Sequence, residues 1–282
     1  MPRSLRIATC RTLPEPDEDQ APLLAALAER GVAARMAAWD DPAEPWDQPA
    51  PTVIRSTWNY IHDLDAFLAW AARAAAAGPL WNPLDIVAAN VHKSYLADLE
   101  RRGHRIVPTL FFRRGARVAL GCAAGERGFA AIVVKPTVGA ASFATRRFAS
   151  ADDPAAQAFV DELVAQRDVM VQAYVPSVED YGERALVWID GALTHAVRKT
   201  PRFAHEDETV SPALPIAPDE RALAEAVLAP LGDRLVYGRV DVARGADGRP
   251  LIMELELVEP SLFVARHPPA LARLADALAR RL

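Results

Sequence analysis

The chain has 282 residues, of which 51% are hydrophobic and 24% are charged, and its formal net charge is −5. This composition is typical of a globular protein long enough for two or three domains. The negative charge argues against a general nucleic-acid-binding role. No apolar run reaches the length of a membrane span, because Arg73 and Gly78 interrupt the alanine-rich segment.

The two cysteines, Cys10 and Cys122, are too few for a disulfide framework. The first residues lead directly into a strand pattern at residues 5–10, without the apolar core of a signal peptide. We therefore expect a cytoplasmic protein without nucleic-acid or membrane partners. The sequence leaves open whether the protein is a monomer or a homodimer.

The order of the predicted elements divides the chain into three parts. Residues 1–88 alternate short strands with helices and are predicted to form an N-terminal α/β domain. Residues 89–175 form a central domain. Residues 176–282 form a C-terminal domain of antiparallel hairpins, followed by a closing amphipathic helix. The predicted fold class is therefore α/β, with α+β character in the later parts.

A polar and aromatic loop follows a strand of the first domain, with the sequence Arg-Ser-Thr-Trp-Asn-Tyr from Arg55. Ligands of open α/β sheets bind at the carboxyl ends of strands. Arg55 is thus a candidate for gripping a substrate carboxylate, with Ser56 and Tyr60 as hydrogen-bonding partners. The alternative is a structural ion pair between Arg55 and Asp63 or Asp65.

Two lysines stand out in the central domain. Lys93 lies in a helix predicted over residues 90–102, which is followed by a strand over residues 105–112 and a helix over residues 115–124. Lys135 ends a buried strand and precedes a loop of small residues, which lets backbone N–H groups approach phosphate oxygens closely. The Gly-Lys-Ser/Thr ending of a P-loop is missing. The alternative for Lys135 is a strand-end lysine that reaches solvent.

The next segments offer further binding candidates. Tyr174 and Val175 leave a strand as a connector whose amides and apolar wall can take an adenine ring. Glu183 enters a predicted hairpin in which His195 lies mid-strand, and a satisfied structural histidine is the alternative there. Residues 200–213 form a long acidic segment, either a binding loop or a solvated one.

A late hairpin gathers acidic side chains. Strand alternation puts Arg239 and Asp241 on the same face as Glu254 and Glu256, if the strands pair through the glycine-containing turn at residues 245–248. Three carboxylates packed together without a cation repel one another, and some would take up protons. Mg²⁺ removes this problem, because it takes oxygen ligands and is usually held by one or two carboxylates plus nucleotide phosphates. The alternative is a solvated outer face of an antiparallel sheet.

Taken in order, these features resemble the ATP-grasp family over nearly the whole chain. Within that family the sequence is similar to the cyclo-ligases that close O-ureido-D-serine to D-cycloserine, a step of antibiotic biosynthesis. The likeness rests on Ala-Thr-Cys-Arg at 8–11 with Asp-Glu-Asp at 17–19, Arg-Ser-Thr-Trp-Asn-Tyr at 55–60, Glu-Asp-Tyr-Gly-Glu at 179–183, Thr-His-Ala-Val-Arg-Lys at 194–199, and Met-Glu-Leu-Glu-Leu-Val-Glu-Pro at 253–260.

The resemblance implies an ATP-grasp fold, in which an N-terminal α/β domain precedes a two-lobed ATP-binding region with the central domain as its lid. It implies ATP and Mg²⁺ as cofactors and a small amino-acid-like substrate. The implied residues are Lys93 and Lys135 for the phosphates; Gln172, Tyr174 and Val175 for adenine; Glu183 or Glu179 for ribose; Asp241, Glu254 and Glu256 for Mg²⁺; Arg239 for the transferring phosphoryl group; and Arg55, Ser56, Tyr60, His195 and Lys199 for the substrate. Many family members have Asn where this chain has Glu256, which leaves the number of magnesium ions open.

The implied reaction activates a carboxylate as an acyl phosphate, which a nitrogen of the same molecule then attacks. One alternative is an intermolecular carboxylate–amine ligase acting on amino acids or peptides. A second is a nucleotide-binding module without catalysis, which would release no ADP. A third is a small-molecule kinase, which would give a stable phosphorylated product.

Overall fold

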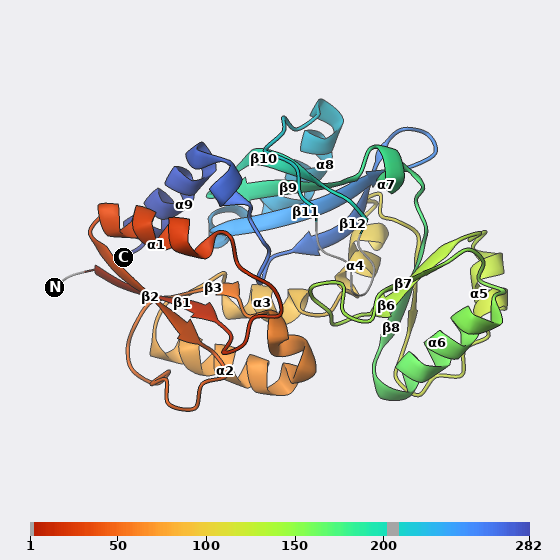
Figure 1. Ribbon diagram of the computed structural model, residues 1–282, viewed down its shortest axis with the longest axis horizontal. Helices are drawn as coiled ribbons and strands as arrows, with labels where there is room; N and C mark the ends of the chain where they lie inside the picture. Colours follow the sequence, from red (N-terminus) through yellow and green to blue (C-terminus); the bar gives the residue numbers. More distant parts are fainter. Residues whose placement is uncertain (1–2, 202–208) are drawn as a thin grey trace.

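The computed structural model describes residues 3–201 and 209–282. Within these residues the strands form three four-stranded sheets, one in each of the three parts of the chain (Figure 1). Part of the acidic segment expected over residues 200–213 lies outside the described residues. Each helix in the described ranges is too short or too polar to cross a membrane.

The first sheet is parallel and buried on both faces, which explains the apolar strands of the N-terminal part. Its order is β2 (Val32–Ala38), β1 (Arg3–Thr9), β3 (Thr52–Ser56) and β4 (Leu80–Trp81). The apolar stripe of α1 (Gln20–Glu29) packs on one face together with α9 (Pro268–Arg280), which returns from the end of the chain. Helix α2 (Leu64–Ala77) covers the other face with Phe67 and Trp70.

The central sheet is antiparallel, in the order β5 (Thr109–Phe112), β8 (Val169–Ala173), β6 (Ile132–Pro136) and β7 (Arg146–Phe148). Helices α5 (Leu120–Glu126) and α6 (Pro154–Gln166) pack on it through an apolar core of its own. This part stands to the right in Figure 1, apart from the other two sheets.

The third sheet is antiparallel, in the order β10 (Ala192–Lys199), β9 (Glu183–Ile189), β11 (Tyr237–Arg244) and β12 (Pro250–Glu256). Helix α8 (Pro218–Leu228) covers one face. The shorter elements are η1 (Trp58–His62), α3 (Leu84–Asn90), α4 (Tyr95–Arg101), α7 (Ser177–Asp180), η2 (Ala229–Arg234) and η3 (Val264–Arg266).

The tight turn between β11 and β12 is confirmed. The Gly245 N–H donates to the Arg249 carbonyl at 2.9 Å, and Gly248 has a φ of 73°, a conformation that glycine adopts without strain. The hairpin therefore pairs in the register that the alternation of the two strands requires.

The helix predicted over residues 90–102 forms only over α4, and its predicted beginning is wrong. The chain forms α3 and α4, and Lys93 lies in the turn between them. The Lys93 N–H donates to the Thr137 carbonyl at 2.8 Å, and the Asn90 side chain bonds the backbone of Leu255 and Leu257. These contacts with other parts of the chain hold the turn open.

Two neighbouring boundaries also differ from the prediction. Strand β5 begins only at Thr109, because Pro108 has no N–H and the Val107 N–H instead donates to the Ile252 carbonyl at 2.8 Å. Helix α5 begins only at Leu120, whose N–H donates to the Gln157 side chain at 2.9 Å. Both departures arise from tertiary contacts.

The domain boundaries at residues 88 and 175 stay predictions. The C-terminal part as predicted includes α9, yet α9 packs on α1 of the first part, and Leu274 and Leu278 share a core with Leu23 and Leu27. The first and third sheets therefore share apolar packing.

Candidate active site

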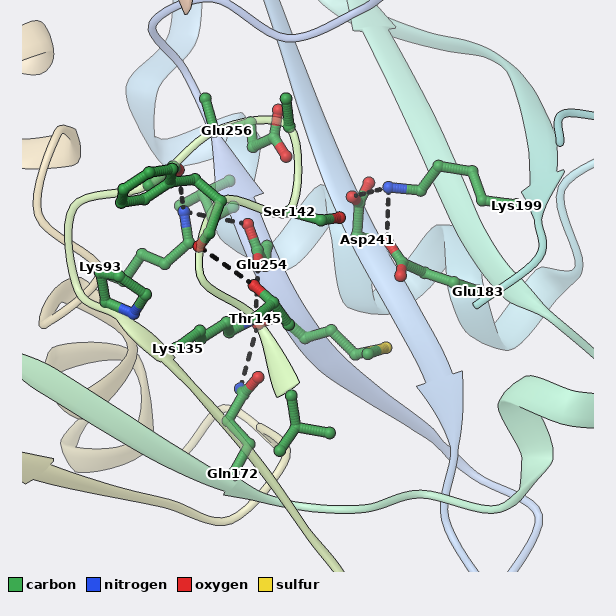
Figure 2. Close-up of a pocket in the computed structure, with 18 of the residues that line it drawn as sticks. Lys93, Lys135, Ser142, Thr145, Gln172, Glu183, Lys199, Asp241, Glu254 and Glu256 are labelled. Atoms are coloured by element: carbon green, nitrogen blue, oxygen red, sulfur yellow. Dashed lines mark hydrogen bonds and ion pairs between the residues drawn. The ribbon is translucent and has the colours of Figure 1, made fainter. Parts of the chain in front are cut away.

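A pocket opens where the three parts of the chain meet. The hairpin β11–β12 forms its floor, strands β6 and β8 of the central sheet line one side, and η1, which follows β3, lines another. Most of the sequence-predicted residues line it: Tyr60, Lys93, Lys135, Gln172, Tyr174, Val175, Glu183, Lys199, Arg239, Asp241, Glu254 and Glu256. Figure 2 shows part of this lining, with Lys135, Gln172, Glu183, Lys199, Asp241 and Glu254 converging from strands that are distant in sequence.

The charged face of the late hairpin forms as the alternation predicts. Arg239 pairs across the strands with Glu256, and Asp241 pairs with Glu254. Arg239 makes a two-pronged contact with Asp241 at 2.7 and 2.8 Å and reaches Glu256 at 2.6 Å. Burial alone would raise the pKa of Asp241, but Arg239 and Lys199 outweigh it and hold that pKa far below its usual range. The face is therefore a lining of the pocket and not a solvated outer surface.

Two lysines of the central part share one carboxylate. Lys135 Nζ lies 2.5 Å from one oxygen of Glu254, and Lys93 Nζ lies 3.2 Å from the other. Burial would raise the pKa of Glu254, but Lys135 and Lys93 lower it to about 2. Both lysines are mostly buried, so the solvated alternative for Lys135 does not hold. The result is a desolvated cluster of positive groups beside the small-residue loop, where the Lys93 ammonium also donates to the Gly139 carbonyl at 2.9 Å.

A second cationic contact lies on the opposite side of the pocket. Lys199 Nζ lies 2.5 Å from Glu183 and 2.7 Å from Asp241 (Figure 2). Burial raises the pKa of Glu183 to about 7, with Asp241 adding to the rise and Lys199 opposing it. Lys199, the last residue of β10, therefore links Glu183 of β9 to Asp241 of the β11–β12 hairpin.

The connector after β8 forms the apolar end of the pocket. Tyr174 and Val175 line it, while the buried Gln172 amide donates to Thr109 Oγ1 at 3.2 Å and to the Met253 carbonyl at 3.4 Å. Glu179 lies outside the pocket lining. It accepts a hydrogen bond of 2.6 Å from the Tyr174 hydroxyl, and burial together with this bond raises the pKa of Tyr174 to about 12.

Three predicted substrate residues do not reach the pocket lining. Arg55 is only 2% exposed and donates to the Pro260 carbonyl at 2.9 Å. The structural alternative for Arg55 therefore holds, although its acidic neighbour, at 3.6 Å, is Asp19 and not Asp63 or Asp65. Ser56 is buried against Thr9 Oγ1 at 2.9 Å.

His195 is likewise buried, with its ring 4.8 Å from that of His267 and its Nδ1 2.9 Å from Thr194 Oγ1. Burial is the main reason that its pKa falls to about 4, which keeps the imidazole neutral near pH 7. This environment is that of a structural histidine.

The prediction missed several pocket residues, chiefly Trp58, Tyr95 and Glu259. Glu259 follows the end of β12, so the alternation that identified Glu254 and Glu256 no longer applies to it. The signal in the sequence that could have indicated this residue is the Glu-Pro pair that follows shortly after the end of β12. The small-residue loop was identified, but not that Ser142 and Thr145 line the pocket.

Comparison with known proteins places this site in a family. Over 286 positions, spanning 94% of this chain and 94% of the relative, the sequence is 34% identical to cycloserine biosynthesis protein DcsG from Streptomyces lavendulae. The chain belongs to the DcsG family. Residues 5–82 of this DcsG-family protein match the family described as the N-terminal domain of D-cycloserine synthetase DcsG.

Solved structures agree with this assignment. A crystal structure of D-cycloserine synthetase DcsG matches with a TM-score of 0.88 and 33% identity, covering 99% of both chains. The ATP-grasp ligase PsnB matches with a TM-score of 0.67 and 20% identity over 99% of both chains. A D-alanine–D-alanine ligase from Bacillus anthracis matches with a TM-score of 0.71 and 15% identity, over 99% of this chain and 96% of that chain. The predicted ATP-grasp fold is confirmed, and this DcsG-family protein is an ATP-dependent ligase.

Proposed function

We propose that this protein uses ATP to close O-ureido-D-serine to D-cycloserine. The observation that carries the proposal is the 34% identity to the cycloserine biosynthesis protein DcsG over 94% of both chains. The chemistry of the pocket supports this proposal. Its lysines, its arginine and its carboxylates suit a nucleotide and a metal ion, and a further polar region suits a small zwitterion.

The chemistry explains why ATP is needed. A carboxylate is a poor electrophile, and transfer of the γ-phosphoryl group converts it to an acyl phosphate, with ADP as the other product. The ureido nitrogen bonded to oxygen then attacks the acyl carbon, loses its proton and displaces phosphate. Because that nitrogen belongs to the same molecule, ring closure avoids the entropy cost of bringing in a second reactant. The carbamoyl group on this nitrogen is released with the addition of water.

The lysines and the arginine are assigned to the phosphates. Lys93 and Lys135 would bind phosphate oxygens from their positions beside the Glu254 carboxylate, which both lysines contact. Arg239 would orient the phosphoryl group during its transfer, since its guanidinium presents several N–H donors in a rigid plane. Asp241 fixes the orientation of the Arg239 guanidinium, because its two carboxylate oxygens accept hydrogen bonds from two of the guanidinium nitrogens.

The acidic residues suit Mg²⁺ by donor type. Asp241, Glu254 and Glu256 offer the carboxylate oxygens that this ion prefers. Within the described residues, no group of three or more acidic, histidine or cysteine side chains is arranged so that it could hold a metal ion by itself. When bound, Mg²⁺ would neutralise negative charge on those phosphates.

The remaining roles follow the two ends of the pocket. Tyr174 and Val175 would border adenine, with Gln172 fixing the strand behind them. Glu183 would bind the ribose hydroxyls, and Glu179 stays the second candidate for them. At the polar end, Tyr60 and Lys199 are the two predicted substrate residues that line the pocket.

A coupled assay of phosphate and ADP release tests the function. O-ureido-D-serine, its L isomer, single amino acids and amino-acid pairs are each incubated with Mg-ATP, and the product is identified by mass. Release of ADP with D-cycloserine as product is the expected result. Release only with an amino-acid pair would favour the intermolecular ligase, and tight ATP binding without turnover on any substrate would favour a silent module.

A further inference from the structure

The polar end of the pocket is built around the segment that follows β12. Glu259 lines the pocket there, next to Tyr60 and Trp58 of η1. The Trp58 indole N–H donates to the Glu259 carbonyl at 2.9 Å, and Arg55 donates to the next carbonyl, that of Pro260, at 2.9 Å. Two buried side chains of the first part of the chain therefore hold the backbone on which Glu259 sits.

Glu259 differs from the other acidic residues in its charge balance. Glu183, Asp241, Glu254 and Glu256 each have a lysine or arginine nitrogen within 4 Å. Within residues 3–201 and 209–282, no such ion pair reaches Glu259. Among the residues that the structure describes, no lysine or arginine nitrogen thus lies within 4 Å of the Glu259 carboxylate, although the residue lines the pocket.

The groups around Glu259 do not neutralise its negative charge. Burial and the nearby Glu256 carboxylate raise the pKa of Glu259 to about 7, whereas the Tyr60 phenol, through a hydrogen bond, and the more distant Lys93 lower it. A buried carboxylate with a like charge beside it is a favourable position for a ligand that brings a positive group.

We propose that Glu259 binds the α-ammonium group of the substrate, and that the enzyme thereby selects α-amino acids over simple carboxylic acids. This inference rests on the proposed function, which requires the substrate carboxylate to lie at Arg239. The ammonium of an α-amino acid is attached to the carbon next to that carboxylate. Arg239 contacts Glu256 at 2.6 Å, and Glu259 lies three residues beyond Glu256, the last residue of β12.

The position also separates Glu259 from the expected metal ligands. Asp241, Glu254 and Glu256 share one face of the β11–β12 hairpin, whereas Glu259 lies beyond β12, on the side of the first part of the chain. A single carboxylate can thus serve the ammonium while the hairpin serves the nucleotide and its ion. Tyr60, which lines the pocket with Glu259 and lowers its pKa, would help to orient the carboxylate.

Calorimetric titration with two matched ligands tests this role without turnover. The enzyme is first saturated with Mg²⁺ and a non-hydrolysable ATP analogue, and is then titrated with O-ureido-D-serine or with 3-(ureidooxy)propanoic acid, which lacks only the amino group. Wild-type enzyme should bind the deamino ligand about 10- to 100-fold more weakly, the range expected for one charge-assisted contact. Glu259→Gln should bind both ligands about equally, and Glu259→Asp should recover part of the preference.

The matched control is Glu225→Gln, a change in an exposed glutamate of α8 paired with Arg221. It should keep the wild-type preference. A Glu259→Gln enzyme that still discriminates as well as the wild type, while melting normally, would overturn the role of Glu259 and leave the proposed function standing. Wild-type enzyme that binds neither ligand would overturn the proposed function, and the inference with it.

Discussion

At the scale of residues, the pocket contains a network of paired charges. Lys135 and Lys93 share Glu254, and Arg239 and Lys199 share Asp241. Ions taken out of water need such partners, because an unpaired buried charge costs several kcal/mol. The network therefore keeps the basic groups in the pocket, oriented and desolvated, until phosphates compete for them.

Arg239→Lys should lower turnover by about 100-fold or more. A lysine supplies a point charge and cannot contact both oxygens of Asp241 while also reaching Glu256. The measurement is the rate of ADP release at saturating ATP and substrate. The same exchange at the exposed Arg221 should leave the rate unchanged, and wild-type turnover in the Arg239→Lys enzyme would remove the assigned role.

Asp241→Asn and Glu254→Gln should both abolish most turnover but should differ in stability. Asp241 is 1% exposed between Arg239 and Lys199, so its neutralisation leaves two buried cations undercompensated, at a cost of about 3 kcal/mol. Glu254 is 17% exposed at its side chain, and the lysines beside it can turn toward the open pocket. Urea unfolding of the two variants measures this, and equal losses of stability would contradict the assigned difference in burial.

Glu259→Gln should change how stability depends on pH. Because the folded-state pKa of Glu259 is raised from about 4.5 to about 7, its contribution is fully present below pH 4.5 and is lost as the pH rises through 7. The glutamine variant lacks this loss, so relative to wild type it should be more stable at pH 8 than at pH 4.5, by about 3 kcal/mol. Unfolding in urea at both pH values tests it, and a pH-independent difference would show that Glu259 is not perturbed.

At the scale of elements, the segment from residue 257 to residue 265 positions the polar end of the pocket although it contains almost no regular structure. Its backbone groups are bonded by side chains from elsewhere. Asp19 accepts the N–H groups of Leu262 and Ala265 at 3.1 and 3.0 Å, and Arg55 donates to the Pro260 carbonyl. A chain segment without its own ladder of hydrogen bonds depends on such contacts for a single conformation.

Asp19→Ala should therefore destabilise the protein by about 3 kcal/mol and lower turnover. It leaves one buried and one partly buried N–H group unpaired and removes the carboxylate nearest to the buried Arg55, at 3.6 Å. Chemical unfolding and ADP release report the two effects. As a comparison, Asp276→Ala breaks an ion pair with Arg30 in which Asp276 is half exposed, and should leave the stability nearly unchanged. Similar losses in the two variants would contradict the positioning role of Asp19.

At the scale of the whole molecule, the first and third sheets are joined both by apolar packing and by one buried amide. The Asn82 side chain, just after β4, donates to the carbonyls of Tyr237 and Leu257 at 2.9 and 2.7 Å and accepts the Val236 N–H at 2.9 Å. The pocket lies at this junction, so its geometry depends on the two parts folding together.

Asn82→Leu should destabilise the protein by about 3 kcal/mol or more, since three buried backbone groups lose their partner at once. In the wild type, the first and third parts of the chain should unfold together in one transition. Far-ultraviolet circular dichroism and tryptophan fluorescence should report the same midpoint, since buried tryptophans lie in both parts, among them Trp70 and Trp188. Two well-separated transitions in the wild type would contradict the coupling.

The features that sequence predicts well are local ones. Arg239 and Asp241 face Glu254 and Glu256 because a short turn brings adjacent strands together and side chains alternate with a period of two. The small-residue loop after Lys135 is local in the same way, and so is the connector at Tyr174. These patterns, together with their order along the chain, carry the resemblance to the ATP-grasp family and identify most of the charged residues that line the pocket.

Only the tertiary structure decides the roles that depend on distant partners. Arg55 contacts a carbonyl 205 residues away, and Glu259 is held by an indole 201 residues away, so no spacing in the sequence reveals either. The physical reason is that alternation and turn chemistry act over a few residues, whereas burial and ion pairing depend on which segments meet in space. The sequence by itself determined the acidic hairpin, and the packing of the first and third sheets determined which end of the pocket Glu259 faces.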